Sequence, residues 1–248
     1  MSKVLIIGGG ASGMMCAAAA ASAGHEVHIF EKNEKLGKKL FITGKGRCNL
    51  TNDSPVEEHI RNIETNPKFM YSALYTFDSS AVTDFFESRG LRLKTERGNR
   101  VFPASDHSSD VIRTLERVLK ESGVHVHLHA EVKGLMTGPR EDAPGLKVRG
   151  IKLADGEVCG DAVVIATGGL SYAATGSTGD GYRFAEETGH EVMRQSPALV
   201  PVNTRESFVR ELAGLSLKNV RLSVYEGSKE IFSDMGEMLF THTGISGP

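Results

Sequence analysis

The first thirty residues combine two short apolar runs with an alanine-rich segment between them. Val4–Ile7 is a continuous apolar run, typical of a strand buried on both faces of a parallel sheet. Ala11–Ala23 is compatible with a helix throughout, and Gly24 is placed as its C-terminal stop. Val27–Phe30 follows as a second strand. This pattern predicts a strand–helix–strand unit of an α/β fold.

The middle of the chain, residues 55–122, has a mainly helical pattern. Pro55 and Pro67 stand where prolines begin helices. Residues 108–122 form an amphipathic helical pattern, and two short strand-like pieces around Gly98 predict a hairpin. We therefore expect several helices and one hairpin in this part of the chain.

Beyond residue 125 we expect a strand, a small meander and a further buried strand at Ala162–Ala166. Ser177 and Asp180 have the spacing of a capping box, which predicts that they open a helix ending at Gly189.

After Ser196 the pattern alternates as in antiparallel strands. We place a boundary near residue 192, which divides a first domain of residues 1–191 from a β-rich segment of residues 192–248. Because the sequence stops at Pro248 inside a glycine-rich loop, we expect that it is truncated.

Composition narrows the class of protein. A chain of 248 residues with 40% hydrophobic and 24% charged residues is an ordinary globular protein. Its net charge of −2 gives no global basic field, so neither nucleic acid nor an anionic membrane is expected as a main partner. Cys16, Cys48 and Cys159 lie far apart, which predicts a reducing compartment and no zinc knuckle. With no signal peptide or membrane-length apolar run, we expect a cytoplasmic protein.

A glycine motif directly follows the first predicted strand. Gly8, Gly10 and Gly13 form G-x-G-x-x-G, in which the second glycine lets the backbone approach a pyrophosphate. The N–H groups at the start of the following helix attract the same anion. Glu31 ends the second strand 18 residues after Gly13, close to the ~20 expected for the acid that binds ribose hydroxyl groups. The motif predicts a dinucleotide site that favours FAD or NAD over NADP.

A second segment favours FAD over NAD. The other glycine cluster, Gly176 to Gly181, has the wrong order for a second dinucleotide fingerprint. Ala162–Gly169 reads AVVIATGG, and this buried strand with a small-residue end resembles the ATG motif of two-dinucleotide-binding flavoproteins. Small residues at the carboxyl end of a strand let the chain approach a cofactor in the crevice of the sheet.

The loop ITGKGRCNLTN, residues 42–52, lacks the spacing of a P-loop. In two-dinucleotide-binding flavoproteins the segment after the ribose-binding acid runs along the cofactor towards the flavin. Gly44 and Gly46 are then expected to allow close backbone contact, while Lys38, Lys45 and Arg47 balance negative charge on the pyrophosphate or the reduced flavin.

At this point a family resemblance becomes specific. The segments GKKLFITGKGRCNLTN, ATGGLSY, GSTGDGY, PALVP and FTHTGISGP resemble the BaiN/RdsA-type flavoproteins, also called aminoacetone oxidase-like NAD(P)/FAD-dependent oxidoreductases. The resemblance runs from residue 3 to the end. It implies an α/β fold with a Rossmann-like, doubly wound FAD-binding domain and the start of a β-rich inserted domain near residue 192. It also implies a helical domain and a return to the FAD sheet, which this sequence lacks.

From the motifs and the resemblance together we expect these residues to contact FAD: Gly8, Gly10, Ala11, Ser12, Gly13, Glu31, Lys32, Lys38, Thr43, Gly44, Gly46, Arg47, Cys48, Asn49, Val132, Ala166, Thr167, Gly168, Gly169 and Asp180. Cys48 has no partner cysteine, which favours a structural or flavin-lining thiol over a redox pair. His125, His127 and His129 share a strand face, for which solvent contact is favoured over metal binding, so no metal site is expected. His242 is favoured as a residue without a role towards substrate. The sequence assigns no catalytic acid or base.

The preferred hypothesis is an FAD-dependent oxidoreductase in which the flavin exchanges a hydride with a small organic substrate. The resemblance allows either amine oxidation or reduction of an activated carbon–carbon double bond, with NAD(P)H as a transient electron donor. Two alternatives stay open: a non-catalytic nucleotide-binding module or inactive fragment, and an NAD-dependent dehydrogenase.

Overall fold

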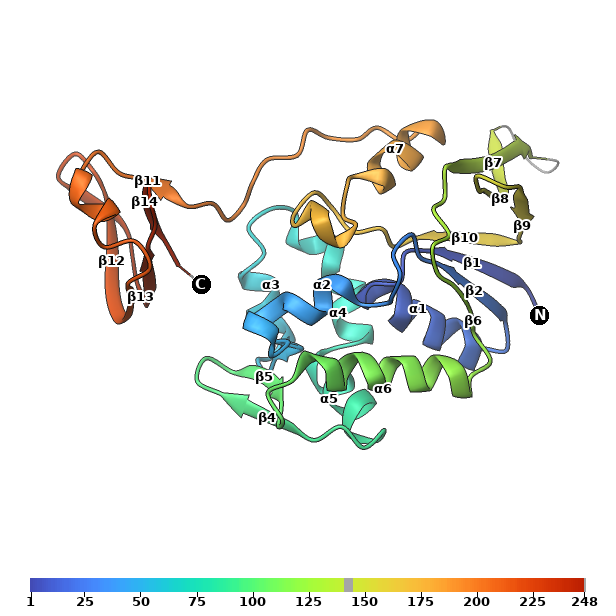
Figure 1. The fold of residues 1–248 in the computed structure, drawn as a ribbon, viewed down its shortest axis with the longest axis horizontal. Coiled ribbons are helices and arrows are strands. Elements are labelled where there is room, and N and C mark those ends of the chain that lie inside the picture. The colour runs from blue at the N-terminus through green and yellow to red at the C-terminus, as the bar shows by residue number, and fades with distance from the viewer. Residues whose placement is uncertain (141–144, 248) are drawn as a thin grey trace. The chain divides into compact units, whose positions relative to one another are not determined.

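The computed structural model describes residues 1–140 and 145–247 (Figure 1). The chain divides into two compact units, Met1–Val192 and Met193–Pro248.

A four-stranded parallel sheet is the centre of the first unit, with the strand order β10-β1-β2-β6. Its strands are β1 (Lys3–Ile7), β2 (Glu26–Phe30), β6 (His125–His127) and β10 (Ala162–Ile165). The two apolar runs at the start of the chain thus form neighbouring strands, as predicted. The carboxyl ends of β1, β2 and β10 lie at the same edge of the sheet, because parallel strands share a direction.

Both faces of the sheet are covered, which explains why its strands read as apolar runs rather than as alternating patterns. On one face, Ile6 and Ile29 pack against the helices α1 (Ala11–Ser22) and α6 (Ser108–Glu121). On the other, Leu5 and Phe30 pack with residues of an antiparallel meander and of one further helix. These elements are β7 (Gly134–Pro139), β8 (Leu146–Lys152), β9 (Glu157–Cys159) and α7 (Asp180–Glu187) (Figure 1).

The expected helices and hairpin are present between the second strand and α6. The helical elements are α2 (Lys38–Ile42), the 3-10 turn η1 (Thr43–Gly46), α3 (Val56–Arg61), η2 (Pro67–Met70), α4 (Tyr71–Thr76) and α5 (Ser79–Glu87). The hairpin pairs β4 (Leu93–Glu96) with β5 (Arg100–Pro103), and the short strand β3 (Thr51–Asn52) joins its other edge. Pro55 precedes α3 and Pro67 opens η2, so both prolines stand at helix starts as expected.

The predicted capping box at the start of α7 is wrong. The helix begins at Asp180, its N-cap is Gly179 with φ 87°, and no side chain caps it. The hydroxyl of Ser177 accepts a hydrogen bond from Lys39 instead. A contact with a residue 138 positions away has replaced the local cap that the spacing suggested.

The second unit is an antiparallel sheet with the order β11-β14-β13-β12. Its long hairpin joins β12 (Ser216–Glu226) to β13 (Lys229–Phe240), and β14 (Gly244–Ser246) pairs with β13 and with β11 (Val202–Asn203). The remaining regular elements are the 3-10 turns η3 (Ala173–Thr175), in the first unit, and η4 (Ser207–Arg210). The alternating pattern after Ser196 therefore predicted the hairpin. Before the hairpin, however, only Val202 and Asn203 form a strand.

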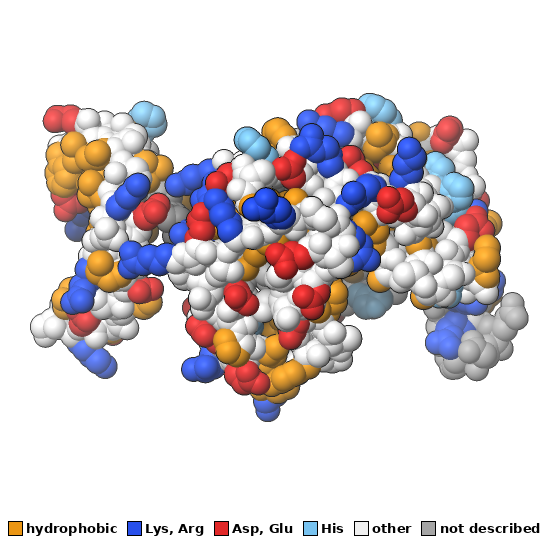
Figure 2. Space-filling view, turned by 90° about the horizontal axis from the view of Figure 1, so that it is seen from below, with side chains coloured by type: hydrophobic (Ala, Val, Ile, Leu, Met, Phe, Trp, Pro, Cys, Tyr) orange, Lys and Arg blue, Asp and Glu red, His pale blue; other side chains and the backbone are white. Residues whose placement is uncertain are grey.

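Charge is mixed on the surface of the chain. Figure 2 shows Lys and Arg side chains interspersed with Asp and Glu side chains over the face that it presents. In the part of the chain that the structure describes, no helix combines the length and the apolar character needed to span a bilayer.

Candidate functional site

A cavity of about 700 Å³ lies where the carboxyl ends of β1, β2 and β10 meet the first turn of α1. Ligands of open α/β sheets bind at this kind of edge. The cavity is lined by 15 of the 20 residues predicted from the sequence: Gly8, Gly10, Ala11, Ser12, Glu31, Lys32, Lys38, Thr43, Cys48, Asn49, Val132, Ala166, Thr167, Gly168 and Asp180. These residues come from segments far apart in the chain, and the fold brings them together around one cavity.

The three motif glycines have different surroundings: Gly8 and Gly10 lie in the loop between β1 and α1, and Gly13 lies in the first turn of α1. A Cβ on Gly8 would lie 2.5 Å from the carbonyl oxygen of Ala166, and a Cβ on Gly13 would lie 2.0 Å from that of Gly8. A Cβ on Gly10 would meet no atom within 4 Å. Gly8 and Gly13 thus allow close backbone packing, while Gly10 leaves space open in the cavity wall.

The start of α1 faces the same cavity. The N-cap of the helix is Gly10, and no side chain caps its first N–H groups. Ala11 and Ser12, the first two helical residues, both line the cavity. Because the N-terminus of a helix carries a partial positive charge and unpaired N–H donors, this arrangement suits an anion.

Glu31 is a buried carboxylate at the cavity, with 7% of its surface exposed. Its Oε2 accepts a hydrogen bond of 2.7 Å from the backbone N–H of Gly9. Its Oε1 accepts bonds from the backbone N–H of Asn33 at 2.8 Å and from the side-chain amide of Asn33 at 2.6 Å. Glu31 therefore ties the glycine loop to the end of β2.

Two lysines fasten the segment after β10 to the segment after β2. Lys32 Nζ lies 2.7 Å from the Asp180 carboxylate and 2.7 Å from the Thr178 hydroxyl. Burial opposes ionisation of Asp180, but hydrogen bonds from Lys32 and Thr178 outweigh it and hold the pKa of Asp180 below its usual value. Lys39 Nζ donates to the Ser177 hydroxyl at 2.7 Å. These contacts define one side of the cavity.

Cys48 lines the cavity as a neutral thiol. Its residue is 2% exposed, and burial raises the pKa of the thiol to about 11. The thiolate is the reactive form of cysteine, so this environment disfavours nucleophilic or redox chemistry at neutral pH. The geometry agrees with the expectation of a lining thiol, and in the described part of the chain Cys48 is a free cysteine.

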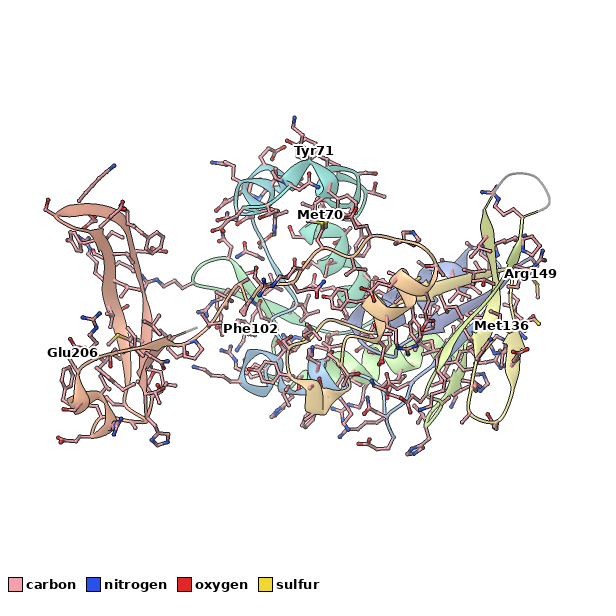
Figure 3. All side chains as sticks on the ribbon, turned by 90° about the horizontal axis from the view of Figure 1, so that it is seen from above. Met70, Tyr71, Phe102, Met136, Arg149 and Glu206 are labelled. Carbon is pink, nitrogen blue, oxygen red and sulfur yellow. The ribbon has the colours of Figure 1, made fainter. Side chains whose placement is uncertain are left out.

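Five of the predicted residues do not line the cavity: Gly13, Gly44, Gly46, Arg47 and Gly169. Arg47 is the most informative of them. Its Nε lies 2.7 Å from Asp106, and its guanidinium also pairs with Glu96. It stacks over the ring of Phe102, which Figure 3 labels, at 4.1 Å from the centroid. The structure therefore places the charge of Arg47 on the β4–β5 hairpin and its following turn, not at the cavity.

Sequence reasoning missed several polar contributors to the cavity wall, among them Gly9, Asn33 and Lys39. Gly9 was passed over because it lies between the motif glycines, yet its N–H binds Glu31. Asn33 stands two residues after Glu31, and a short amide beside a predicted ribose-binding acid is the signal that could have identified it. The partners of Lys39 lie more than 130 positions away, so no local signal indicates its role.

The histidines of β6 form a ring stack with β2 rather than a metal site. His28 stacks between His125 and His127, with centroid distances of 4.6 and 5.3 Å. His28 Nδ1 lies 3.0 Å from His127 Nε2, so one of the two nitrogens donates a hydrogen to the other. His129 lies outside the strand, with φ 55°. Within residues 1–140 and 145–247, no three His, Cys, Asp or Glu side chains are arranged to hold a metal ion.

Comparison with known proteins identifies the family. The HI0933-like protein Rossmann domain matches residues 2–247. This chain belongs to the HI0933-like family. The match to a Rossmann domain agrees with the parallel sheet and with the family resemblance found in the sequence motifs.

Two relatives cover nearly the whole HI0933-like chain. The 3-dehydro-bile acid delta(4,6)-reductase of Clostridium scindens is 35% identical over 224 residues, which is 90% of this chain and 52% of that protein. The ribosomal RNA dihydrouridine synthase of Haemophilus influenzae is 31% identical over 251 residues, which is 100% of this chain and 59% of that protein. The chain thus spans between about half and three fifths of the length of these relatives.

Solved structures support the fold. The 3-ketosteroid delta1-dehydrogenase of Sterolibacterium denitrificans superposes with a TM-score of 0.63 at 15% identity, covering 88% of this chain and 62% of that one. A flavocytochrome c3 fumarate reductase gives a TM-score of 0.53 at 20% identity, covering 88% and 47% of the two chains. At such low identity these likenesses establish the fold alone.

The name of the Haemophilus relative bears on one expectation from composition. A net charge of −2 indicated that nucleic acid is not a main partner. Since a relative over the full length of this chain is named for ribosomal RNA, net charge does not exclude such a partner in this family.

Proposed function

We propose that this chain binds FAD in the cavity and uses it to reduce a carbon–carbon double bond activated by a carbonyl group. The proposal that the chain binds FAD rests on three features that line one cavity. They are the open backbone at Gly10, the uncapped start of α1 and the buried carboxylate of Glu31. These are the features that bind the pyrophosphate and the ribose of a dinucleotide.

The residues present suit FAD. The space beside Gly10 admits a pyrophosphate, and the first N–H groups of α1 supply donors to it. Glu31 accepts hydrogen bonds and suits the ribose hydroxyl groups, since a carboxylate disfavours the phosphorylated ribose of NADP. Ala166, Thr167 and Gly168 form a wall without bulky side chains at the end of β10, where the cofactor continues.

The names of the relatives favour reduction over amine oxidation. A delta(4,6)-reductase of a 3-dehydro compound and a dihydrouridine synthase are both named for adding hydrogen to a double bond conjugated with a carbonyl group. When bound, the reduced flavin supplies a hydride to one carbon of such a bond, and a proton adds to the other. The protein binds and orients the reactants in the cavity, and NAD(P)H is the expected class of electron donor.

One part of the cavity wall, away from the glycine loop, is apolar. Phe77, Val82 and Phe86 come from α5 and the turn before it, and Leu115 comes from α6. Apolar walls exclude water, which strengthens electrostatic interactions and protects a hydride-transfer step. This surface suits a substrate with an apolar face.

An anaerobic single-turnover experiment on the protein in its native length tests the proposal. We expect the reduced protein to recover the visible absorption of oxidised flavin when a 3-keto-4-ene steroid or a uridine-containing RNA is added, with a product two hydrogen atoms heavier. Amine oxidation would be favoured if an amine reduced the oxidised flavin and neither the steroid nor the RNA reoxidised the reduced flavin. Absence of flavin absorption in the protein after addition of FAD and removal of the unbound FAD would reject both.

A variant at Glu31 tests the cofactor site itself. Glu31→Ala removes the acceptor for the ribose hydroxyl groups, and charged hydrogen bonds contribute about 1.5–3 kcal/mol. We expect FAD affinity to fall by about tenfold to a hundredfold, measured by fluorescence titration. Unchanged affinity would remove Glu31 from the site, and tighter binding of NAD than of FAD would revive the NAD-dependent alternative.

A further inference from the structure

A second hollow lies on the outer side of α6, and it shares no lining residue with the cavity described above. It has a volume of about 620 Å³ and is formed by the turn between α5 and β4, the residues after β5 and the exposed side of α6. Four arginines line it: Arg89, Arg92, Arg113 and Arg117. We refer to this hollow as the arginine groove.

The positive charge in the arginine groove is largely uncompensated. Asp110 is the one carboxylate in its lining, and it already accepts hydrogen bonds from Arg113 and Ser105. Among the described residues, Arg89, Arg92 and Arg117 have no carboxylate partner. The lining of four arginines and one aspartate therefore carries a net charge of +3, although the whole chain carries −2.

The two arginines of the groove that lie on α6 repel each other. Arg113 and Arg117 are one turn apart on α6, and like charges at this spacing destabilise a helix. Two of the arginines are nonetheless held in place. Arg89 stacks on the ring of Phe85 at 3.9 Å and donates to its carbonyl oxygen, and Arg117 donates to the carbonyl oxygen of Arg89. Donors held in advance lose less conformational freedom when a ligand binds.

We propose that the arginine groove binds phosphate esters that carry more than one phosphate group. Arginine binds phosphate through two parallel hydrogen bonds, and three uncompensated charges call for a ligand with several negative charges. The lining contains no aromatic ring on which a base could stack, so the groove recognises phosphate groups rather than bases. This site is independent of the proposed flavin chemistry.

Binding measurements on the native-length protein, kept in excess FAD, test the proposal. The probes are a short fluorescent single-stranded RNA, followed by anisotropy at low salt, and unlabelled inorganic pyrophosphate as a competitor. The test variant is Arg92→Gln with Arg117→Gln. The matched control is Arg61→Gln with Arg221→Gln, which removes two exposed arginines outside the groove and gives the same net charge.

We expect the groove variant to bind at least about tenfold more weakly than the control, with a shallower dependence of affinity on salt. Displacement of the RNA by pyrophosphate would assign the groove to phosphate groups in general, and binding of RNA without displacement would assign it to a nucleic-acid backbone. Equal weakening in the two double variants, or no binding of either probe at low salt, would overturn the proposal. Unchanged flavin absorption and thermal unfolding show that each variant is folded.

Discussion

The loop Gly8–Gly13 and the loop Thr43–Arg47 both concentrate glycines near the predicted cofactor, but the structure uses those glycines differently. In the first loop, Gly8 and Gly13 remove side chains that would collide with backbone atoms, and Gly10 leaves an open space. In the second, Gly44 and Lys45 adopt left-handed conformations with φ 58° and 59°, which turn the chain sharply. Glycine content alone therefore does not distinguish a ligand-binding loop from a tight turn.

The two loops also differ in what holds them. The first is held by Glu31, a residue that lines the cavity. The second ends at Arg47, which pairs with Glu96 and Asp106 on the neighbouring hairpin and the turn after it. Variants of the two loops should accordingly separate effects on cofactor binding from effects on folding.

The largest expected effect is on stability, from Gly13→Ala. A Cβ there would lie 2.0 Å from the carbonyl oxygen of Gly8, so α1 must shift away from the loop. Overpacking of this kind typically costs about 1–3 kcal/mol. We expect the free energy of unfolding, measured by urea denaturation, to fall by about 3 kcal/mol. A loss below about 0.5 kcal/mol would show that the helix can adjust freely, against the packing described here.

Gly10→Ala is the matched change in the same loop and should act on binding alone. Gly10 has φ −83°, which any residue adopts, and its added methyl group meets no protein atom within 4 Å. We expect stability to be unchanged or raised by up to about 1 kcal/mol. FAD affinity should fall by about tenfold or more, because the methyl group enters the space proposed for the pyrophosphate. Unchanged affinity would place the pyrophosphate elsewhere.

Arg47→Ala should have the opposite profile. Removing the guanidinium leaves Glu96 and Asp106 with Lys94 as their neighbour, so the loss is partly compensated. We expect the free energy of unfolding to fall by about 1 kcal/mol, as for other half-exposed ion pairs with a cation–π contact. FAD affinity, measured by titration, should not change. A loss of affinity as large as that of Gly10→Ala would restore Arg47 to the cofactor site.

The smallest expected effect is a pH dependence of stability that arises from His127 in β6. Burial lowers the pKa of His127, and the positive charges of the neighbouring His28, His125 and Lys3 lower it further. Glu26 is hydrogen-bonded to His28 and not to His127. The folded state therefore binds fewer protons than the unfolded state, so stability falls as pH drops below the ordinary histidine value of about 6.5.

Urea unfolding at several pH values between about 7.5 and 5.5 measures this slope, and His127→Gln should flatten it. The Glu31 N–H donates to the His127 carbonyl oxygen at 2.9 Å, so loosening of β6 should also weaken the first loop. An identical slope in the variant would assign the pH dependence to other groups.

The parts of the fold and site that the sequence predicted are those specified over short distances. The strand–loop–helix at the glycine motif and the position of Glu31 follow from about thirty consecutive residues, and both are present. The sequence did not predict the pairing of Arg47 with Asp106, because Asp106 lies 59 positions away in a turn whose approach no local pattern indicates. The capping role of Ser177 failed for the same reason, since Lys39 competes for its hydroxyl group.

The sheet order has a consequence for how the protein is made. β1 leaves the ribosome long before one of its two neighbours in the sheet, β10, and the contact between Lys3 and Asp161 spans 158 positions. Until β10 has been synthesised, one edge of β1 stays unpaired, and the wall formed by Ala166–Gly168 does not exist. Long-range pairings of this kind form slowly and leave strand edges exposed to aggregation. We therefore expect the edge of β1 to need protection, by a chaperone or by delayed collapse, until the segment that ends at Gly168 has emerged, and the cavity to be complete only then.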